Sequence, residues 1–159
     1  MVFSKSIRTF FPFAIAVGVA SAAAGSLTEM SVHRWYVHIA KPAWTAPAKI
    51  FGPVWTILYA AMALAAWLVY KKEGWASAQK SLTLWGIQLI VNALWPGFFF
   101  ALRSPRLGAI AIMVLLLLVM ATTVAFWRRD RTAGLLMLPY CLWTAYAAAL
   151  TVAIWRMNR

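Results

Sequence analysis

Two carboxamide side chains, Gln88 and Asn92, lie inside a long stretch of the chain that contains no charged residue. They are four residues apart, and Trp95 and Phe99 continue the same row at helical spacing. An amide is costly to bury in an apolar environment unless it is hydrogen-bonded. Two interpretations fit this spacing equally well: a hydrogen bond between neighbouring helices, or a polar spot in a cavity with aromatic walls.

Two further rows of residues with aromatic members occur at helical spacing. The first row consists of Trp55, Tyr59 and Met62. The second lies near the C-terminus and consists of Pro139, Trp143, Ala147 and Leu150, with Tyr140 and Tyr146 beside it. A single aromatic row is usually core packing. Three rows with polar edges instead favour a pocket in which a flat aromatic ligand stacks on the rings while the amides fix its orientation.

Groups for conventional catalysis are sparse. The chain has only three acidic residues, which lie far apart in connecting segments: Glu29, Glu73 and Asp130. A proton relay of the kind found in transporters therefore has no obvious members. His33 and His38 do not share a helical face and are interpreted as loop residues, and Cys141 as a small core residue. We expect no metal, no cofactor, and neither hydrolysis nor phosphoryl transfer by the usual groups.

The composition indicates a membrane protein. The chain has 159 residues, a length typical of one domain, and 64% of them are hydrophobic, against about 45–50% in soluble domains. Charged residues make up 11%, compared with about 25% usually. A net charge of +12 would indicate nucleic-acid binding in a soluble protein. Here we interpret it as cations facing anionic lipid headgroups.

Five stretches without charge are each about as long as a helix that crosses the hydrocarbon core. They are residues 10–27, 51–70, 82–102, 107–127 and 133–155. Because open sheets leave backbone groups unsatisfied in lipid, the sequence predicts an all-α membrane protein, one domain over residues 1–159. The first stretch also fits a cleavable signal peptide, but we favour a helix that packs closely through small residues: Ala14, Gly18, Ala22 and Ser26.

The connections between these stretches differ in length. Residues 28–50 form a long segment with Trp35, Trp44 and two prolines, and we expect it to fold over one mouth of the bundle as a lid. Residues 71–81 form a connection of eleven, whereas 103–106 and 128–132 predict tight hairpins. Lysine and arginine are divided eight against seven between the two sides, so the orientation is not predicted. Residues 113–120 are expected to face lipid, and Trp85 to lie at the interface or against lipid.

Four strings of residues resemble the signature segments of the TspO/translocator-protein family, also called peripheral benzodiazepine receptors. The first two are Trp35-Tyr36 with Lys41-Pro42-Ala43-Trp44-Thr45-Ala46-Pro47, and Phe51-Gly52-Pro53-Val54-Trp55 with Tyr59 and Met62. The third is Gln88-Leu89 with Asn92, Trp95 and Phe98-Phe99. The fourth is Pro139-Tyr140 with Trp143, Ala147 and Leu150, followed by Trp155-Arg156 and Asn158. The strings are in order and cover the chain from about Trp35 to Asn158.

The resemblance implies a bundle of five transmembrane helices, often a homodimer, with a ligand pocket closed by the first loop. By motif position, the pocket would be lined by Tyr36, Trp55, Asn92, Trp95, Phe98, Trp143, Ala147 and Leu150. Ligands of the family are porphyrins, cholesterol and other hydrophobic molecules, together with isoquinoline and benzodiazepine drugs. Some members are reported to degrade protoporphyrin in light, which is attributed to the tryptophans that match Trp55 and Trp143; these two would then be catalytic.

This chain departs from the family pattern at three places. Ala46-Pro47 replaces paired prolines, Thr151 replaces an asparagine, and no tyrosine lies between Leu150 and Arg156, where a cholesterol motif requires one. Porphyrin is therefore favoured over cholesterol. We predict a receptor or carrier in a bacterial membrane that binds tetrapyrroles such as protoporphyrin IX for handling or sensing. The alternatives are a light-dependent porphyrin-degrading enzyme, a cholesterol or lipid translocator, and a scaffold whose aromatic rows are only core.

Overall fold

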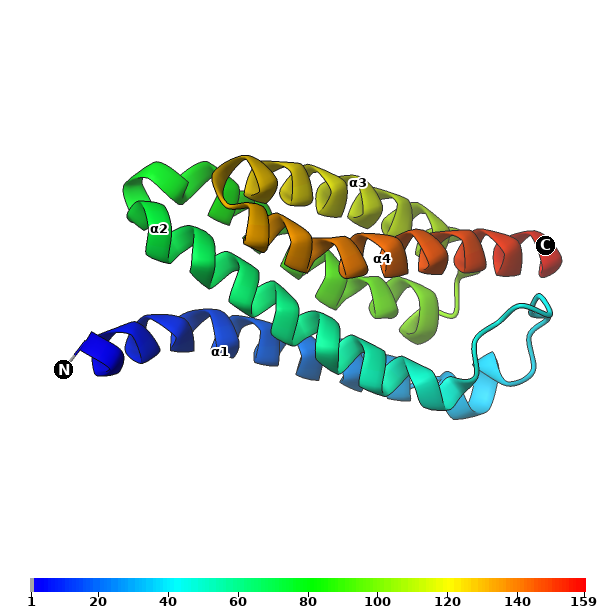
Figure 1. Cartoon of the computed structure of the whole chain (residues 1–159). Helices are drawn as coiled ribbons and strands as arrows, with labels where there is room; N and C mark the ends of the chain where they lie inside the picture. Colours follow the sequence, from blue (N-terminus) through cyan, green and yellow to red (C-terminus); the bar gives the residue numbers. More distant parts are fainter. Residues whose placement is uncertain (1) are drawn as a thin grey trace.

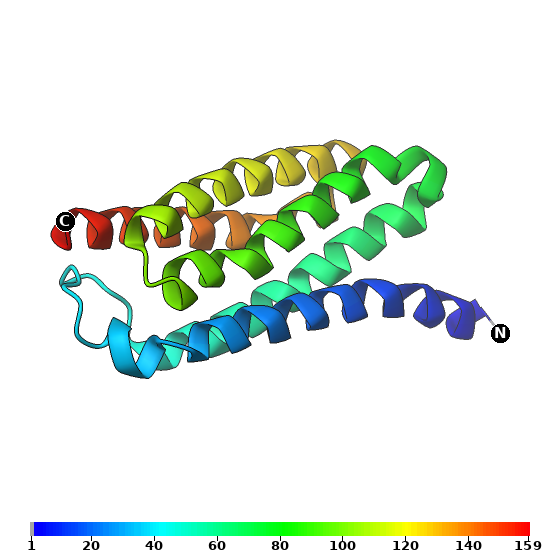
Figure 2. The ribbon, with the colours of Figure 1, turned by 180° about the vertical axis from the view of Figure 1, so that it is seen from behind.

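The computed structural model describes the backbone of residues 2–159 and the side chains from Arg8 onward. Within this range the regular structure is helical, without a strand. In chain order the elements are α1 (Val2–Glu29), the π-helical turn η1 (Val32–Tyr36), α2 (Ala48–Pro96), the π-helical turn η2 (Gly97–Ala101), α3 (Pro105–Arg129) and α4 (Arg131–Met157). The long helices run side by side along one axis of the molecule (Figures 1 and 2). The predicted all-α class is confirmed for the described residues.

Helix α2 has two arms that meet at Gly74 and run back along each other (Figures 1 and 2). The backbone of Gly74 has φ 71° and ψ 173°, a conformation that glycine adopts without a steric penalty. The predicted connection over residues 71–81 is therefore wrong, because the chain stays helical on both sides of a reversal at one residue. With α2 and η2 counted together, four helices of the described chain are long and apolar enough to cross a membrane.

The starts of α3 and α4 have side-chain caps. The Ser104 hydroxyl accepts a hydrogen bond of 3.3 Å from the Leu107 amide at the start of α3, and Pro105 occupies the first turn. The Asp130 carboxylate accepts one of 2.9 Å from the Ala133 amide at the start of α4. The predicted hairpins at 103–106 and 128–132 are confirmed, because each cap lets a new helix begin within a few residues.

Helix α1 packs on the first arm of α2 through a face that the sequence analysis did not select. Its buried side chains are Phe13, Val17 and Ala20. The predicted row of small residues does not form this contact: Gly18, Ala22 and Ser26 are exposed, and a side chain added at Gly18 would meet nothing within 4 Å. The larger residues remove more apolar area from contact with the surroundings, and their shapes interlock with α2.

Two predictions of lipid-facing residues are corrected by the packing. Within 113–120, Leu115 and Val119 are fully buried and only the opposite face is exposed. Trp85 is also buried and packs edge-to-face on Phe13, with ring centroids 5.7 Å apart. Lipid and protein core are equally apolar, so an apolar segment gives no signal for which of its faces turns inward.

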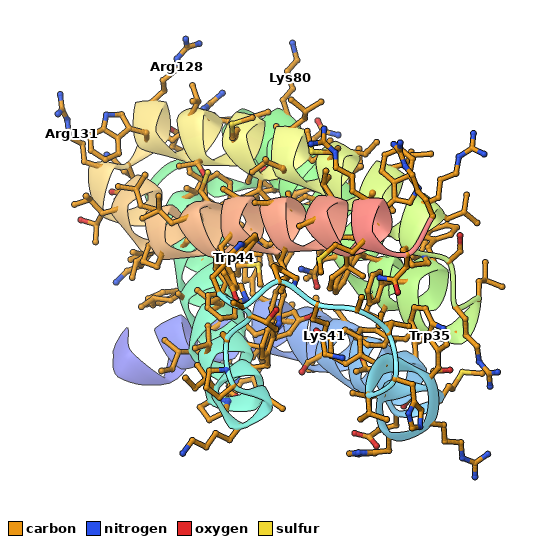
Figure 3. The ribbon with its side chains drawn as sticks, turned by 90° about the vertical axis from the view of Figure 1, so that its right-hand side faces the viewer. Trp35, Lys41, Trp44, Lys80, Arg128 and Arg131 are labelled. Atoms are coloured by element: carbon orange, nitrogen blue, oxygen red, sulfur yellow. The ribbon has the colours of Figure 1, made fainter. Side chains whose placement is uncertain are left out.

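Most charged side chains lie at the two ends of the bundle. At the end that holds Gly74, Lys72 pairs with Asp130 and Arg129 with Glu73, which links α2 to the α3–α4 turn. Figure 3 shows Lys80, Arg128 and Arg131 pointing away from the bundle. Lys71 lies 4.9 Å from the ring of Trp67, and Arg131 lies 5.6 Å from that of Trp127. This arrangement of aromatic rings and cations is typical of a membrane interface.

Candidate functional site

A chain of hydrogen bonds joins both arms of α2 to α4 in the buried centre. The Tyr59 hydroxyl donates to Asn92 Oδ1 (2.5 Å), and Asn92 Nδ2 donates to the Tyr140 hydroxyl (2.9 Å). Tyr140 in turn donates to Gln88 Oε1 (2.8 Å), whose Nε2 faces the Met62 sulfur at 3.8 Å. We call these five residues the polar network. Both amides thus have partners across the helix interfaces, and no charged side chain belongs to the network.

Two tryptophans lie on either side of this network. The ring of Trp55 packs on Tyr59 and Tyr140, with centroids 5.7 Å and 6.2 Å apart. The ring of Trp143 packs on Phe51 and Tyr146 at 5.5 Å and 5.2 Å. The indole nitrogen of Trp143 is buried and has no hydrogen-bond partner among the described residues. Trp55 therefore contacts the polar network directly, whereas Trp143 offers a donor that the protein itself leaves unmatched.

The remaining predicted site residues divide between two packed clusters. Ala147 is buried in the central cluster with Trp55 and Trp143. Leu150 and Tyr36 belong to a second cluster at the loop end, where the Tyr36 ring lies 5.4 Å from that of Phe100. Trp95 contacts both clusters; it stacks on Phe99 and donates from its indole nitrogen to the Gly108 carbonyl (3.0 Å). Phe98 belongs to neither cluster and is 38% exposed.

The connection between α1 and α2, residues 30–47, is attached to α4. The Ala40 amide donates to Asn158 Oδ1 (3.0 Å), and Asn158 Nδ2 donates back to the Ala40 carbonyl (2.9 Å). The Ala46 amide donates to the Tyr146 hydroxyl (2.8 Å), and Trp44 packs on the same ring. Figure 3 shows Trp44 beside α4, with Lys41 farther along the loop. We call Asn158 and Tyr146 the loop anchors.

Lys41 holds the same loop from within. Its ammonium group donates to the carbonyls of Tyr36 (2.7 Å) and Ile39 (2.9 Å) and lies 4.9 Å from the centre of the Tyr36 ring. Burial raises the pKa of the Tyr36 hydroxyl above its ordinary value, with a smaller contribution from Tyr146. The phenol is therefore neutral at physiological pH, and Lys41 links two backbone carbonyls of the loop.

A hollow in the described structure opens sideways between the first arm of α2 and α4. It has a volume of about 400 Å³ and apolar walls, formed by Val54, Ile57, Leu58, Pro139, Leu142, Trp143 and Tyr146. We call it the lateral groove. A smaller groove of about 310 Å³ lies between α1 and α2 and includes Gly18, Ser21 and Tyr59.

The sequence was compared with those of known proteins. A sequence model of the TspO/MBR family matches residues 10–156, nearly the whole chain. The chain belongs to the TspO/MBR family. As expected for that family and for its apolar helices, it is a multi-pass membrane protein.

Three relatives align with this chain over most of their own length and over most of the length of this chain. Protein CrtK of Rhodobacter capsulatus is 36% identical over 145 residues, which are 88% of this chain and 89% of that protein. The tryptophan-rich sensory protein of Cereibacter sphaeroides is 36% identical over 149 residues, 94% and 90% of the two chains. The human translocator protein is 35% identical over 128 residues, 79% and 75%.

Three residues have structural roles that were not predicted from the sequence. Asn158 and Tyr146 anchor the loop, and Phe51 packs on Trp143, although each was noted only as a member of a string or as a neighbour of a row. The amide of Asn158, the residue directly after α4, was a possible signal, since a polar side chain just beyond a helix can bond a neighbouring loop.

Proposed function

We propose that this TspO/MBR protein is a membrane receptor or carrier for tetrapyrroles, with a role in their handling or sensing. In this proposal α1, the two arms of α2, α3 and α4 make five crossings, and the 30–47 loop closes a ligand site at one mouth. The ligand contacts are those inferred from the family strings: Tyr36, Trp55, Asn92, Trp95, Phe98, Trp143, Ala147 and Leu150.

The observation that carries the proposal is the combination of ring faces and neutral hydrogen-bonding groups at hydrocarbon depth. Trp55 packs directly on two members of the polar network, Tyr59 and Tyr140. Trp143 supplies a second ring and an indole N–H that has no partner among the residues from Arg8 onward. A flat macrocycle with ring nitrogens gains from stacking on the indoles and from hydrogen bonds to these groups, because few polar groups compete inside the hydrocarbon.

The charge distribution supports a ligand that carries carboxylates. Lys41 lies in the loop, and Arg103, which donates to Ser31 at the start of the loop (3.2 Å), lies at the same mouth. A porphyrin oriented with its apolar edge inward would place its propionates near these cations. Two of the three acidic residues, Glu73 and Asp130, are paired at the opposite end of the bundle, and the third, Glu29, lies 3.4 Å from His33 at the start of the loop.

Saturable quenching of tryptophan fluorescence by protoporphyrin IX tests the proposal. Trp143→Ala and Trp55→Ala should each raise the dissociation constant about tenfold or more, because a central buried aromatic residue contributes about 2 kcal/mol or more to binding. Porphyrin absorbance provides a second readout that does not depend on the deleted indole. Trp75→Ala is the matched control, since Trp75 is exposed beside Gly74. Unchanged affinity in both site variants would remove Trp55 and Trp143 from the site.

The ligand classes and assembly implied by family membership form part of the same proposal. Isoquinoline and benzodiazepine drugs would compete with porphyrin for the site, and the working form would be a homodimer surrounded by membrane lipid. Competition between a drug and protoporphyrin IX, measured with protein whose subunit number has been determined by cross-linking in lipid, checks both statements. Independent, non-competing binding of the two ligands would contradict a shared site.

A second candidate function is light-dependent degradation of the bound porphyrin. The contact of Trp55 with Tyr59 and Tyr140 favours it, because these are oxidisable rings next to the proposed ligand position. Illumination of the purified protein with protoporphyrin IX should then yield a product that is lost in the Trp55→Phe and Trp143→Phe variants. A product that forms equally in the double variant would indicate photosensitisation alone and would leave the receptor function as the better account.

A further inference from the structure

The lateral groove and the attached loop together indicate the route by which a ligand reaches the interior. We propose that the tetrapyrrole enters sideways from the bilayer, through the lateral groove between the first arm of α2 and α4, and that the Trp143 indole acts as the gate. This inference rests on the proposed function and specifies the direction from which its ligand arrives.

The first step of the argument is that the loop mouth is closed. The two backbone bonds between Ala40 and Asn158 and the bond from Ala46 to Tyr146 attach the loop to α4 at two places. Lys41 fixes the segment that precedes them through carbonyls of the loop itself. A ligand that entered from water would have to break several of these bonds and then pass the packed rings of Tyr36, Phe99 and Phe100.

The second step is that the lateral groove opens at hydrocarbon depth. Its walls come from residues 54–58 of α2 and 139–146 of α4, and both segments lie within charge-free stretches of the chain. Its rim residues Ile57 and Leu142 are 68% and 72% exposed, which places them against acyl chains. A volume of about 400 Å³ lies in the range of ligand sites, and a porphyrin, whose macrocycle is apolar, partitions into the bilayer beside it.

The third step is the position of Trp143 between groove and interior. The indole ring forms part of the groove wall, whereas its nitrogen is buried and unpartnered. A rotation of this side chain would connect the groove with the polar network, because Tyr140, about one helical turn before Trp143 on α4, belongs to that network. The same ring then covers the ligand from the membrane side, so one residue both admits and retains it.

Filling the groove tests the route. Leu142→Trp and, on the facing helix, Ile57→Trp each place an indole at the exposed rim, where it does not disturb the core. In lipid nanodiscs, each variant should slow both uptake and release of protoporphyrin IX about tenfold, equivalent to about 1.4 kcal/mol in the barrier, while the dissociation constant stays the same. Leu117→Trp is the matched control, since Leu117 is 61% exposed on α3 outside the groove and should leave both rates unchanged.

A variant with a loosened loop tests the alternative route, which is entry from water at the loop mouth. Asn158→Ala removes an anchor of the loop without touching the groove, so lateral entry predicts an unchanged uptake rate, whereas entry from water predicts a faster one. The route is overturned if the groove variants take up porphyrin as fast as the unmodified protein, if they lose affinity instead of speed, or if Asn158→Ala accelerates uptake. If the unmodified protein binds porphyrin, those results overturn the route but not the proposed function. If the unmodified protein does not bind porphyrin, both the route and the proposed function are overturned.

Discussion

At the scale of single residues, Tyr140 is the most connected member of the polar network. Its side chain is fully buried, and its hydroxyl accepts from Asn92 and donates to Gln88, two residues that lie one helical turn apart on the second arm of α2. In hydrocarbon no solvent replaces a lost partner, so a missing hydroxyl leaves polar atoms unsatisfied. The network therefore fixes the register between α2 and α4.

Tyr140→Phe should lower the free energy of unfolding by about 1–2 kcal/mol, because it leaves an amide donor and an amide acceptor without their partner. Thermal unfolding in one detergent checks this value. Tyr70→Phe is the matched control, since the structure shows no hydrogen bond from the Tyr70 hydroxyl to the described residues, and the loss there should be close to zero. Equal losses in the two variants would contradict the importance of the network.

Residue spacing predicted the members of this network but not their pairing. Gln88 and Asn92 were found as one row, and Tyr59 and Tyr140 as members or neighbours of two others. Periodicity says which residues share a face, but it does not say toward which neighbour that face turns. Trp85 shows the same limit: its buried contact with Phe13 depends on the position of α1, which no local pattern records.

At the scale of elements, the α3–α4 hairpin is tightly packed at Gly134. A Cβ added at Gly134 would lie 2.7 Å from the Trp127 backbone, a distance that requires the helices to separate. Gly134→Ala should therefore destabilise the protein by about 1–3 kcal/mol. Gly86→Ala is the control, because its Cβ meets nothing within 4 Å and the change should be neutral or slightly stabilising. A neutral Gly134→Ala in thermal unfolding would show that the hairpin is not tightly packed.

Asp130 links the start of α4 to the pH dependence of stability. The hydrogen bond from the Ala133 amide, followed by the bond and charge of Lys72, lowers the pKa of Asp130 below its ordinary value. The ionised carboxylate thus favours the folded state. Its contribution is present above the pKa of the unfolded chain, near 4, and is lost as the pH falls through the lowered folded value.

Asp130→Ala should cost about 1 kcal/mol at neutral pH, because the helix cap is lost. Asp130→Asn keeps a capping side chain and should cost less stability at neutral pH. Because this side chain does not titrate, the variant should lack the part of the acid-induced loss of stability that comes from Asp130. Unfolding midpoints measured from pH 7 down to pH 3 separate the two effects. A pH profile of Asp130→Asn identical to that of the unmodified protein would rule out a role for this carboxylate.

The charge-free stretches predicted helix positions well and helix contacts poorly. All five stretches lie in helical structure except for Leu102 at the end of the third, because a buried charge is costly and the pattern of charges therefore marks the ends. The turn at Gly74 was missed because polar residues on both sides of it resemble a loop, although they form the ends of two arms of α2. The small residues of α1 were assigned to packing, but the contact uses Phe13 and Val17 instead.

At the scale of the whole molecule, the 30–47 loop is hydrogen-bonded to the residue that follows α4. Asn158 contacts Ala40 across 118 positions of the sequence. Asn158→Ala should raise hydrogen exchange at the Ala40 amide about tenfold, which corresponds to about 1.4 kcal/mol of lost protection. The Thr123→Ala variant, whose hydroxyl bonds only within α3, should leave exchange in the loop unchanged. Loop exchange that is already fast in the unmodified protein would contradict a closed mouth.

Figures 1 and 2 show the long helices gathered into one bundle. We place the proposed ligand site among α2, α4 and the loop. The most direct test of this account is a structure of the protein with protoporphyrin IX in a lipid environment. We predict that the macrocycle lies against Trp55 and Trp143, within hydrogen-bonding distance of the polar network or of the Trp143 indole nitrogen. A macrocycle bound only on the outer surface, with both tryptophans and the network unchanged, would contradict the account.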